Sequence, residues 1–172
     1  MKVKEREFEL AVRSYSADLY RFGYWLARDR HVAEDLVQEC FERAWRNWAS
    51  LNDDAALKRW LFTILRHEFL RRFERKHLDT CDIDEVESPI AGGLGLDEAA
   101  ALRQALVNTP ISLREPLLMQ VLGGFSAEEL AELNKTTTGA MTTRLSRARQ
   151  WLRARLDDED PVVRNPAKGG KL

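Results

Sequence analysis

Apolar residues recur at helical spacing along most of the chain, and no segment shows the apolar–polar alternation of a half-buried strand. Three apolar stripes predict helices at about residues 5–27, 31–48 and 55–77, with a polar break at residues 49–54 before the third. These stripes contain enough aromatic and aliphatic residues to bury a common core. The N-terminal part of the chain is therefore expected to form a three-helix unit.

The composition changes at about residue 79. Residues 79–96 are rich in acidic residues, proline and glycine and poor in large apolar residues, which is typical of a flexible linker. Further apolar stripes predict helices at about residues 96–108, 113–122, 126–133 and 137–156. The tail, residues 157–172, has the composition of a disordered segment. The expected fold is all-α, with two small helical domains at residues 1–78 and 97–156.

The last two predicted helices have the pattern of a helix-turn-helix. Ser126 and Glu129 are spaced as a capping box, which marks the start of the first helix. The turn is expected at residues 134–136, where Asn134 tolerates the left-handed conformation better than most residues. Thr137 offers a cap for the second helix, whose buried stripe is Met141, Leu145, Ala148 and Leu152. In a helix-turn-helix the second helix lies in the DNA major groove. The alternative is a solvated basic helix that ends an ordinary bundle.

Charge is strongly segregated although the net charge is only −1. Residues 58–77 carry seven basic and two acidic side chains, and residues 137–156 carry five arginines and no acidic residue. Residues 78–102, between these basic segments, carry seven acidic residues and no lysine or arginine. Two basic segments divided by an acidic one indicate two separate contacts with a polyanion such as DNA.

The predicted second helix has an acidic face opposite its apolar stripe, formed by Glu34, Asp35, Gln38, Glu39 and Glu42. In an isolated domain this face would simply be solvated, whereas in a complex it would dock onto a basic protein surface. Catalysis or metal binding by these carboxylates is disfavoured, because one helix of exposed acids supplies no histidine or second acidic element.

The predicted third helix combines basic residues with aromatic ones, a combination that suits binding of opened DNA. Six basic or histidine side chains crowd its second half. Trp60 is interpreted as a core or partly buried residue in preference to a wedge that enters the DNA.

The sequence indicates a reduced, cytoplasmic protein without a cofactor. It contains no apolar run long enough to span a bilayer and no signal peptide at its start. Its two cysteines, Cys40 and Cys81, are isolated, and Cys40 is expected to be a small core residue. His77 and Cys81 have the spacing of a ligand pair on a helix, but no second pair lies nearby, so no metal site is predicted. Gly-rich phosphate loops and hydrolase motifs are absent, and the chain is not expected to be an enzyme.

Three segments, in one order, resemble an extracytoplasmic-function (ECF) sigma factor of the sigma-70 family. They are VAEDLVQECFERAW (residues 32–45), KRWLFTILRHEFLRR (residues 58–72) and GAMTTRLSRAR (residues 139–149). The resemblance extends over nearly all of residues 5–156. The chain has no room for the additional domains of primary sigma factors, so the two expected domains would correspond to sigma-2 and sigma-4.

The resemblance implies a role for each segment, with RNA polymerase core and promoter DNA as partners and an anti-sigma factor as regulator. The acidic face would dock on the clamp of the β′ subunit through Asp35, Gln38, Glu39 and Glu42. The −10 element would be met by Trp60, Arg66, His67, Arg71, Arg72, Arg75 and Lys76. The −35 element would be met by Thr142, Thr143, Arg144, Ser146, Arg147 and Arg149. Residues 113–122 would help form the surface that meets the β flap. No small-molecule substrate is implied.

The chain departs from the family pattern at several of these positions. His67 stands where asparagine is usual, and Arg71 where aspartate is common. Thr136 replaces the small apolar residue of the usual turn. Thr142 stands at a position where the family often has lysine or arginine. The −10 capture and the −35 sequence are therefore not transferable from the family.

Three other functions remain open at this stage. An autonomous helix-turn-helix repressor or activator would bind duplex DNA unaided, but it would leave the acidic face without a use. A sigma mimic that sequesters an anti-sigma protein would not need the two basic segments. A nuclease or other carboxylate enzyme is the weakest of the three.

Overall fold

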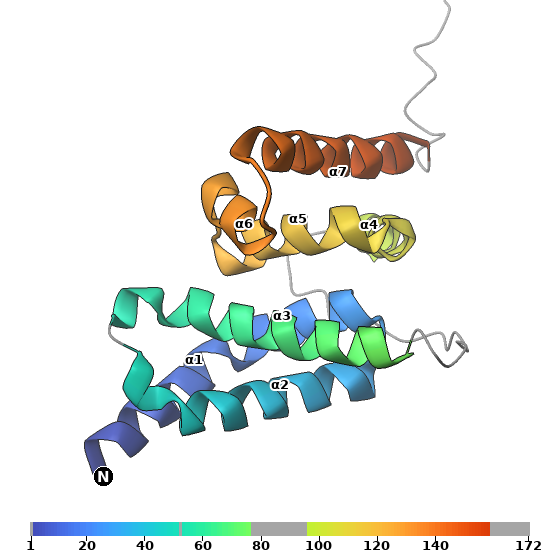
Figure 1. The fold of residues 1–172 in the computed structure, drawn as a ribbon. Helices are drawn as coiled ribbons and strands as arrows, with labels where there is room; N and C mark the ends of the chain where they lie inside the picture. Colours follow the sequence, from blue (N-terminus) through green and yellow to red (C-terminus); the bar gives the residue numbers. More distant parts are fainter. Residues whose placement is uncertain (1, 52, 77–95, 159–172) are drawn as a thin grey trace, which may run out of the picture.

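The computed structural model describes residues 2–51, 53–76 and 96–158, and every regular element in these ranges is helical (Figure 1). The all-α prediction is therefore confirmed. Among the same residues, no helix is both long and apolar enough to cross a bilayer.

The first unit contains three α-helices and two short 3-10 turns: α1 (Lys2–Ala27), α2 (Arg30–Arg46), η1 (Trp48–Ser50), η2 (Asp54–Ala56) and α3 (Leu57–Lys76). The chain leaves α1 at Arg28, which adopts the left-handed conformation with a φ of 56°. Asp29 then caps α2, because its side chain accepts a hydrogen bond from the Val32 N–H at 2.9 Å. The break predicted before the third helix corresponds to the two 3-10 turns.

The core of this unit lies where the three helices meet. Phe22 of α1 stacks on Phe62 of α3 with ring centroids 5.0 Å apart, and both side chains are fully buried. Burying a ring of this size stabilises a fold by about 1.5–3 kcal/mol. Gly23 of α1 lies against α2, where an added Cβ would be in ordinary van der Waals contact with Ala33 Cα at 3.6 Å. Cys40 is fully buried, as predicted, and burial, reinforced by the charge of Glu68, raises the pKa of its thiol to about 12.

The second unit contains α4 (Leu96–Asn108), α5 (Ile111–Gly123), α6 (Ala127–Leu133) and α7 (Thr138–Asp158). α5 ends because Gly124 takes a φ of 73°, and its N–H bonds back to the Gln120 carbonyl at 3.2 Å. Met119, Leu130, Met141 and Leu145 fill the core between α5, α6 and α7.

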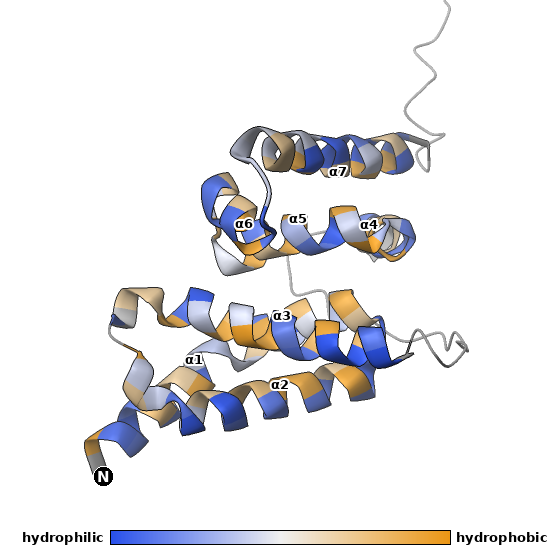
Figure 2. Cartoon of the chain, viewed as in Figure 1, coloured by the Kyte–Doolittle hydropathy of each residue, from blue (hydrophilic) through white to orange (hydrophobic). Residues whose placement is uncertain are grey.

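The two units pack on each other through α5. This helix contacts α1 and α3 on one side and α7 on the other, so it forms a layer between them (Figure 1). Residues 114–119, the middle of α5, are all buried as a result. Hydrophilic residues, blue in Figure 2, lie along the outer side of α2 and on α7. The predicted linker and tail lie almost entirely outside the described residues, so the division into domains stays a prediction.

Candidate functional site

The acidic ridge, which we define as Asp35, Gln38, Glu39 and Glu42, runs along one side of α2. Gln38 and Glu42 are joined by a hydrogen bond of 3.1 Å from Gln38 Nε2 to Glu42 Oε1. Asp35 and Glu39 instead meet Arg72 of α3, whose guanidinium nitrogens lie 3.5 Å from Asp35 Oδ2 and 2.6 Å from Glu39 Oε1. The hydrogen bond to Glu39 raises the pKa of Arg72. The three carboxylates of the ridge are therefore already ion-paired within the chain, Asp35 and Glu39 with Arg72, and Glu42 with the exposed Arg46 at 3.9 Å.

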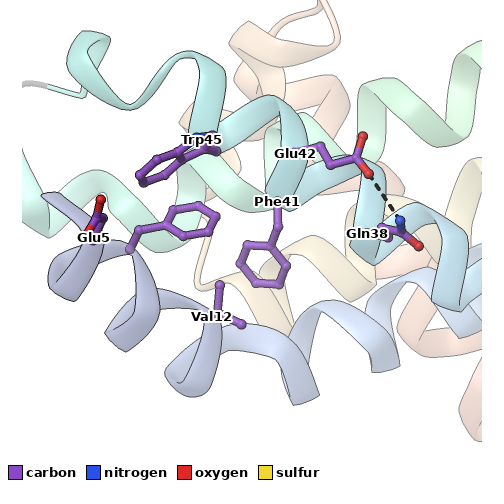
Figure 3. A pocket seen from close by; sticks show the side chains of 7 residues that line it. Glu5, Val12, Gln38, Phe41, Glu42 and Trp45 are labelled. Carbon is purple, nitrogen blue, oxygen red and sulfur yellow. Dashed lines mark hydrogen bonds between the residues drawn. The ribbon is translucent and has the colours of Figure 1, made fainter. Parts of the chain in front are cut away.

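An apolar groove of about 560 Å³ lies between α1 and α2, beside Gln38 and Glu42 of the ridge. Its floor is formed by Phe8 and Val12 of α1 and by Phe41 and Trp45 of α2, with Gln38, Glu42 and Glu5 among its lining residues (Figure 3). Trp45, which the sequence placed in the buried stripe of its helix, keeps 38% of its surface exposed. The prediction that Trp45 is buried is therefore wrong, because the apolar stripe of α2 is wider than the face that α1 covers.

Arg66, one of the residues predicted to meet the −10 element, is buried between the two units. It keeps only 8% of its surface exposed. Its Nε donates to Glu115 Oε1 of α5 at 2.5 Å, and its Nη2 donates to Asn134 Oδ1 at 3.1 Å. In this arrangement the side chain is not accessible to DNA.

The remaining basic residues of α3 lie at the surface of the first unit. Arg71 pairs with the buried carboxylate of Glu68 at 3.3 Å, and Arg43 of α2 pairs with the same carboxylate at 2.6 Å. Arg75 and His67 are exposed, whereas the side chain of Lys76 lies outside the described residues. Partial burial, and then the charges of Arg66 and Arg43, lower the pKa of His67. The surroundings of His67 therefore favour its neutral form, and α3 has fewer unpaired positive charges than its sequence indicates.

Trp60 packs against Trp48 of η1, with ring centroids 6.2 Å apart in an edge-on arrangement. It is half-buried, which confirms the interpretation as a partly buried core residue. A contact with the −10 element through its exposed part stays a prediction.

The helix-turn-helix forms as predicted, with one difference in the turn. The Glu129 N–H donates to Ser126 Oγ at 3.1 Å and the Ser126 N–H donates to Glu129 Oε2 at 2.8 Å, so the capping box is confirmed. The left-handed residue is Lys135, with a φ of 51°, and the prediction that Asn134 takes this conformation is wrong. Asn134 instead stays at a φ of −95°, where its Nδ2 donates to the Leu130 carbonyl at 2.7 Å and closes α6.

One face of α7 packs on the second unit and the opposite face is free. Met141, Leu145 and Ala148 are buried, as predicted, whereas Leu152, the last residue of the predicted stripe, is half-buried and packs against the core. The candidate −35 residues lie opposite: Thr142, Thr143, Ser146, Arg147 and Arg149 are exposed, and Arg144 is half-buried. Thr142 Oγ1 donates to the Thr138 carbonyl at 2.9 Å, which leaves its oxygen as an acceptor. The Arg149 guanidinium donates to the Gln120 side chain of α5.

Sequence reasoning missed the charged residues that join the units. Arg114 is 3% exposed, and it donates to the Thr109 carbonyl at 2.8 Å and to the Leu26 carbonyl of α1 at 3.3 Å. Burial, reinforced by the charge of Arg28, lowers its pKa to about 10. Glu115 is the acceptor of Arg66. The available signal was the pair Arg114-Glu115 in the middle of an otherwise apolar helix, where buried charges need partners.

Comparisons with known proteins place these features in a family context. The family described as Sigma-70 region 2 matches residues 11–78. The ECF RNA polymerase sigma factor EcfG of Rhodopseudomonas palustris is 32% identical over 142 residues, which cover 80% of this chain and 78% of that protein. The ECF RNA polymerase sigma factor SigM of Bacillus subtilis is 31% identical over 150 residues, which cover 81% and 89% respectively.

A solved structure has a similar fold over nearly the whole chain. The sigma factor RpoE of Bartonella quintana, solved in complex with the anti-sigma factor NepR, aligns with a TM-score of 0.69 and 32% identity. The alignment covers 91% of this chain and 98% of that one. The likeness therefore includes both helical units.

Proposed function

Because this chain belongs to the ECF RNA polymerase sigma factors of the sigma-70 family, we propose that it binds the bacterial polymerase core and directs initiation at promoters with −10 and −35 elements. The single observation that carries the proposal is the free face of α7. Arg147, Thr142 and Thr143 lie exposed on the second helix of a helix-turn-helix, opposite the buried stripe. This is the geometry with which such a helix enters the major groove.

The −35 contacts are assigned to Thr142, Thr143, Arg144, Ser146, Arg147 and Arg149. Arginine gives the commonest specific base contact, a bidentate pair with guanine, and threonine hydroxyls and methyls give more adaptable contacts. Arg147 is the residue best placed for a base contact, since Arg149 is held by Gln120.

The acidic ridge is assigned to the β′ clamp, and the exposed basic residues of α3 are assigned to the −10 element. The ridge offers its carboxylates to a basic partner surface, which would replace Arg72 and Arg46 as their partners, and the neighbouring groove offers apolar contact area. His67, Arg71, Arg72, Arg75 and Lys76 would lie along opened DNA, with Arg66 joining them once it is released from Glu115. Contact of α5 with the β flap belongs to the same proposal.

The chain is proposed to act as a regulator without catalysing a reaction, since the polymerase performs the chemistry. An anti-sigma factor is the expected inhibitor, in keeping with the complex in which the similar RpoE was solved. A cytoplasmic location fits both partners.

Run-off transcription tests the function directly. Purified bacterial core polymerase would be incubated with this protein on a pool of genomic promoter fragments, with core alone as the control. New start sites that share spaced −35 and −10 elements are the expected result. A chain that binds core but yields no new start site would support a sigma mimic.

Binding to DNA in the absence of polymerase separates the proposal from a repressor. The free chain should bind promoter duplex weakly, because two separate contacts must be ordered at once. A nanomolar, sequence-specific complex with duplex DNA alone would contradict the proposal and favour an autonomous regulator.

A further inference from the structure

The two candidate DNA helices are only one helix layer apart. α3 packs on α5, and α5 packs on α7 (Figure 1). Packed helices have interaxial distances of about 8–10 Å, so the axes of α3 and α7 are separated by roughly 16–20 Å. We refer to this packing of α5 between α3 and α7 as the closed arrangement.

A promoter needs a much larger separation. The −10 and −35 elements lie about two and a half turns of duplex apart, which is roughly 80–90 Å at 34–36 Å per turn. The 20 residues of α3 add a length of only about 30 Å. In the closed arrangement the chain therefore cannot place both helices on their elements, and α7 with its neighbours must move away from α3.

Contacts of Arg66 hold the closed arrangement together. Its guanidinium reaches Glu115 of α5 and Asn134 of the helix-turn-helix turn, so one side chain of the first unit joins two elements of the second. The Glu115 side chain is 11% exposed, so the pair is shielded from water. Shielded pairs of this kind are costly to break on one side only.

The other contacts between the units are both apolar and polar. Phe62 of α3 and Met119 of α5 lie in one buried core, and Gly123 of α5 lies against Phe62. Arg28 donates to the Val107 carbonyl at 2.6 Å, Arg114 donates to the Leu26 carbonyl, and Arg59 pairs with Glu129 at 3.1 Å. Among the described residues Arg114 forms no ion pair with a carboxylate, and the burial of an uncompensated charge opposes closure. The polar contacts can be exchanged for water when the units separate, whereas the apolar contacts oppose opening.

We propose that Arg66, Glu115 and Asn134 form an intramolecular latch that keeps the free chain in the closed arrangement. In this arrangement Arg66, which is assigned to the −10 element, is bound by the second unit of the same chain. Binding to core polymerase opens the latch. The inference rests on the proposed function. Glu115 takes the place that a DNA phosphate would occupy on Arg66. The free chain is thus self-inhibited for DNA binding before any anti-sigma protein acts.

A cleavable crosslink tests the latch in the full-length protein. Arg59 and Glu129 lie outside the assigned DNA and polymerase contacts, and their side chains meet across the units. Arg59→Cys and Glu129→Cys would be combined with Cys81→Ser and joined by a short, thiol-cleavable bismaleimide. Cys40 is fully buried and does not compete for the reagent. The same protein without crosslinker, and the Glu129→Cys single variant with crosslinker, are the controls.

Run-off transcription with core polymerase is the readout. The crosslinked chain should lose at least about tenfold in transcript yield, because the closed form cannot span both elements, and cleavage should restore the yield. Full activity while crosslinked would overturn the latch and leave the proposed function intact. Wild-type protein that yields no new start site with core polymerase would overturn the proposed function, and the role of the latch with it.

A second variant tests the residues of the latch themselves. Glu115→Gln keeps the shape of the side chain but leaves Arg66 without a counter-charge, so the ratio of closed to open chain should fall at least about tenfold. Single-molecule energy transfer between dyes on α1 and α7 would measure this ratio. Glu128→Gln removes the same charge from an exposed position of α6 and should leave the ratio unchanged. Equal ratios in all three proteins would overturn the assignment of the latch.

Discussion

Helices α3 and α7 are both rich in arginine, but their arginines differ in whether they are ion-paired within the chain. In α3, the arginines at positions 66, 71 and 72 are held by carboxylates of α2, α3 and α5. In α7, no arginine among the described residues forms an ion pair with a carboxylate. One helix is ready to meet a polyanion, whereas the other must first give up its internal partners.

The difference shows that the number of charges in a helix does not measure its affinity for DNA. A DNA phosphate that meets Arg66, Arg71 or Arg72 of α3 replaces a carboxylate, so the gain is the difference between two ion pairs. A phosphate that meets Arg147 replaces only water and counterions. We therefore expect α7 to contribute to DNA affinity directly. We expect α3 to contribute only after the carboxylates that pair with its arginines have found other partners, as when Glu39 and Asp35 dock on polymerase.

The largest expected effect is on the free energy of unfolding, when an arginine of α3 is replaced and the result is compared with the same replacement in α7. Arg66→Ala leaves Glu115 buried without a partner and should reduce the free energy of unfolding by up to about 3 kcal/mol, as for other broken buried pairs. Arg147→Ala should change it by less than about 0.5 kcal/mol, because the side chain is exposed. Urea unfolding followed by circular dichroism measures both.

Replacement of both partners sharpens this prediction. Arg66→Met combined with Glu115→Leu removes the pair without leaving a buried charge, so it should recover most of the stability lost in Arg66→Ala. Equal losses in Arg66→Ala and Arg147→Ala would mean that the two helices do not differ in the way described.

The next effect concerns DNA recognition by α7. Arg147→Ala should weaken use of the −35 element by about 1–3 kcal/mol, the usual value for a base-reading contact. Run-off transcription on promoters with an intact and a scrambled −35 element measures this loss, and the difference between them should shrink. Binding to core polymerase should be unchanged. If Arg147→Ala lost polymerase binding as well, the assignment of α7 would be wrong.

The sequence was sufficient to predict the helices of both units because their signals are local. The stripe of apolar residues at 96–108 coincides with α4, and the spacing of Ser126 and Glu129 specified the cap of α6. The latch has no such local signal, since Arg66 and Glu115 are 49 positions apart. The backbone conformation of Asn134 was predicted wrongly because its side chain is bound by the distant Arg66 as well as by the nearby Leu130 carbonyl.

A smaller effect is expected for the partly exposed pair of Arg72 with Glu39. A double-mutant cycle with Arg72→Ala and Glu39→Ala should give a coupling of about 0.5–1 kcal/mol in the free energy of unfolding, as for other partly exposed pairs. Arg153→Ala on α7 is the matched control, because Arg153 is exposed and its effect should add to that of Glu39→Ala. A coupling energy of zero would mean that the ion pair with Glu39 binds Arg72 no more strongly than the surroundings of α7 bind its exposed arginines.

The smallest effect is the pH dependence of stability that arises from His67. Burial, together with Arg66 and Arg43, lowers its pKa below the ordinary value of 6.5, so the unfolded chain takes up the proton first as the pH falls. The contribution of the neutral imidazole to stability is therefore complete above pH 6.5 and is lost as the pH falls through the pKa of the folded state. The stability of the wild type should therefore fall relative to that of His67→Asn as the pH falls below 6.5, and the urea midpoints of the two proteins measure this change. A difference between the two midpoints that stays constant with pH would show that the pKa of His67 is not lowered in the folded state.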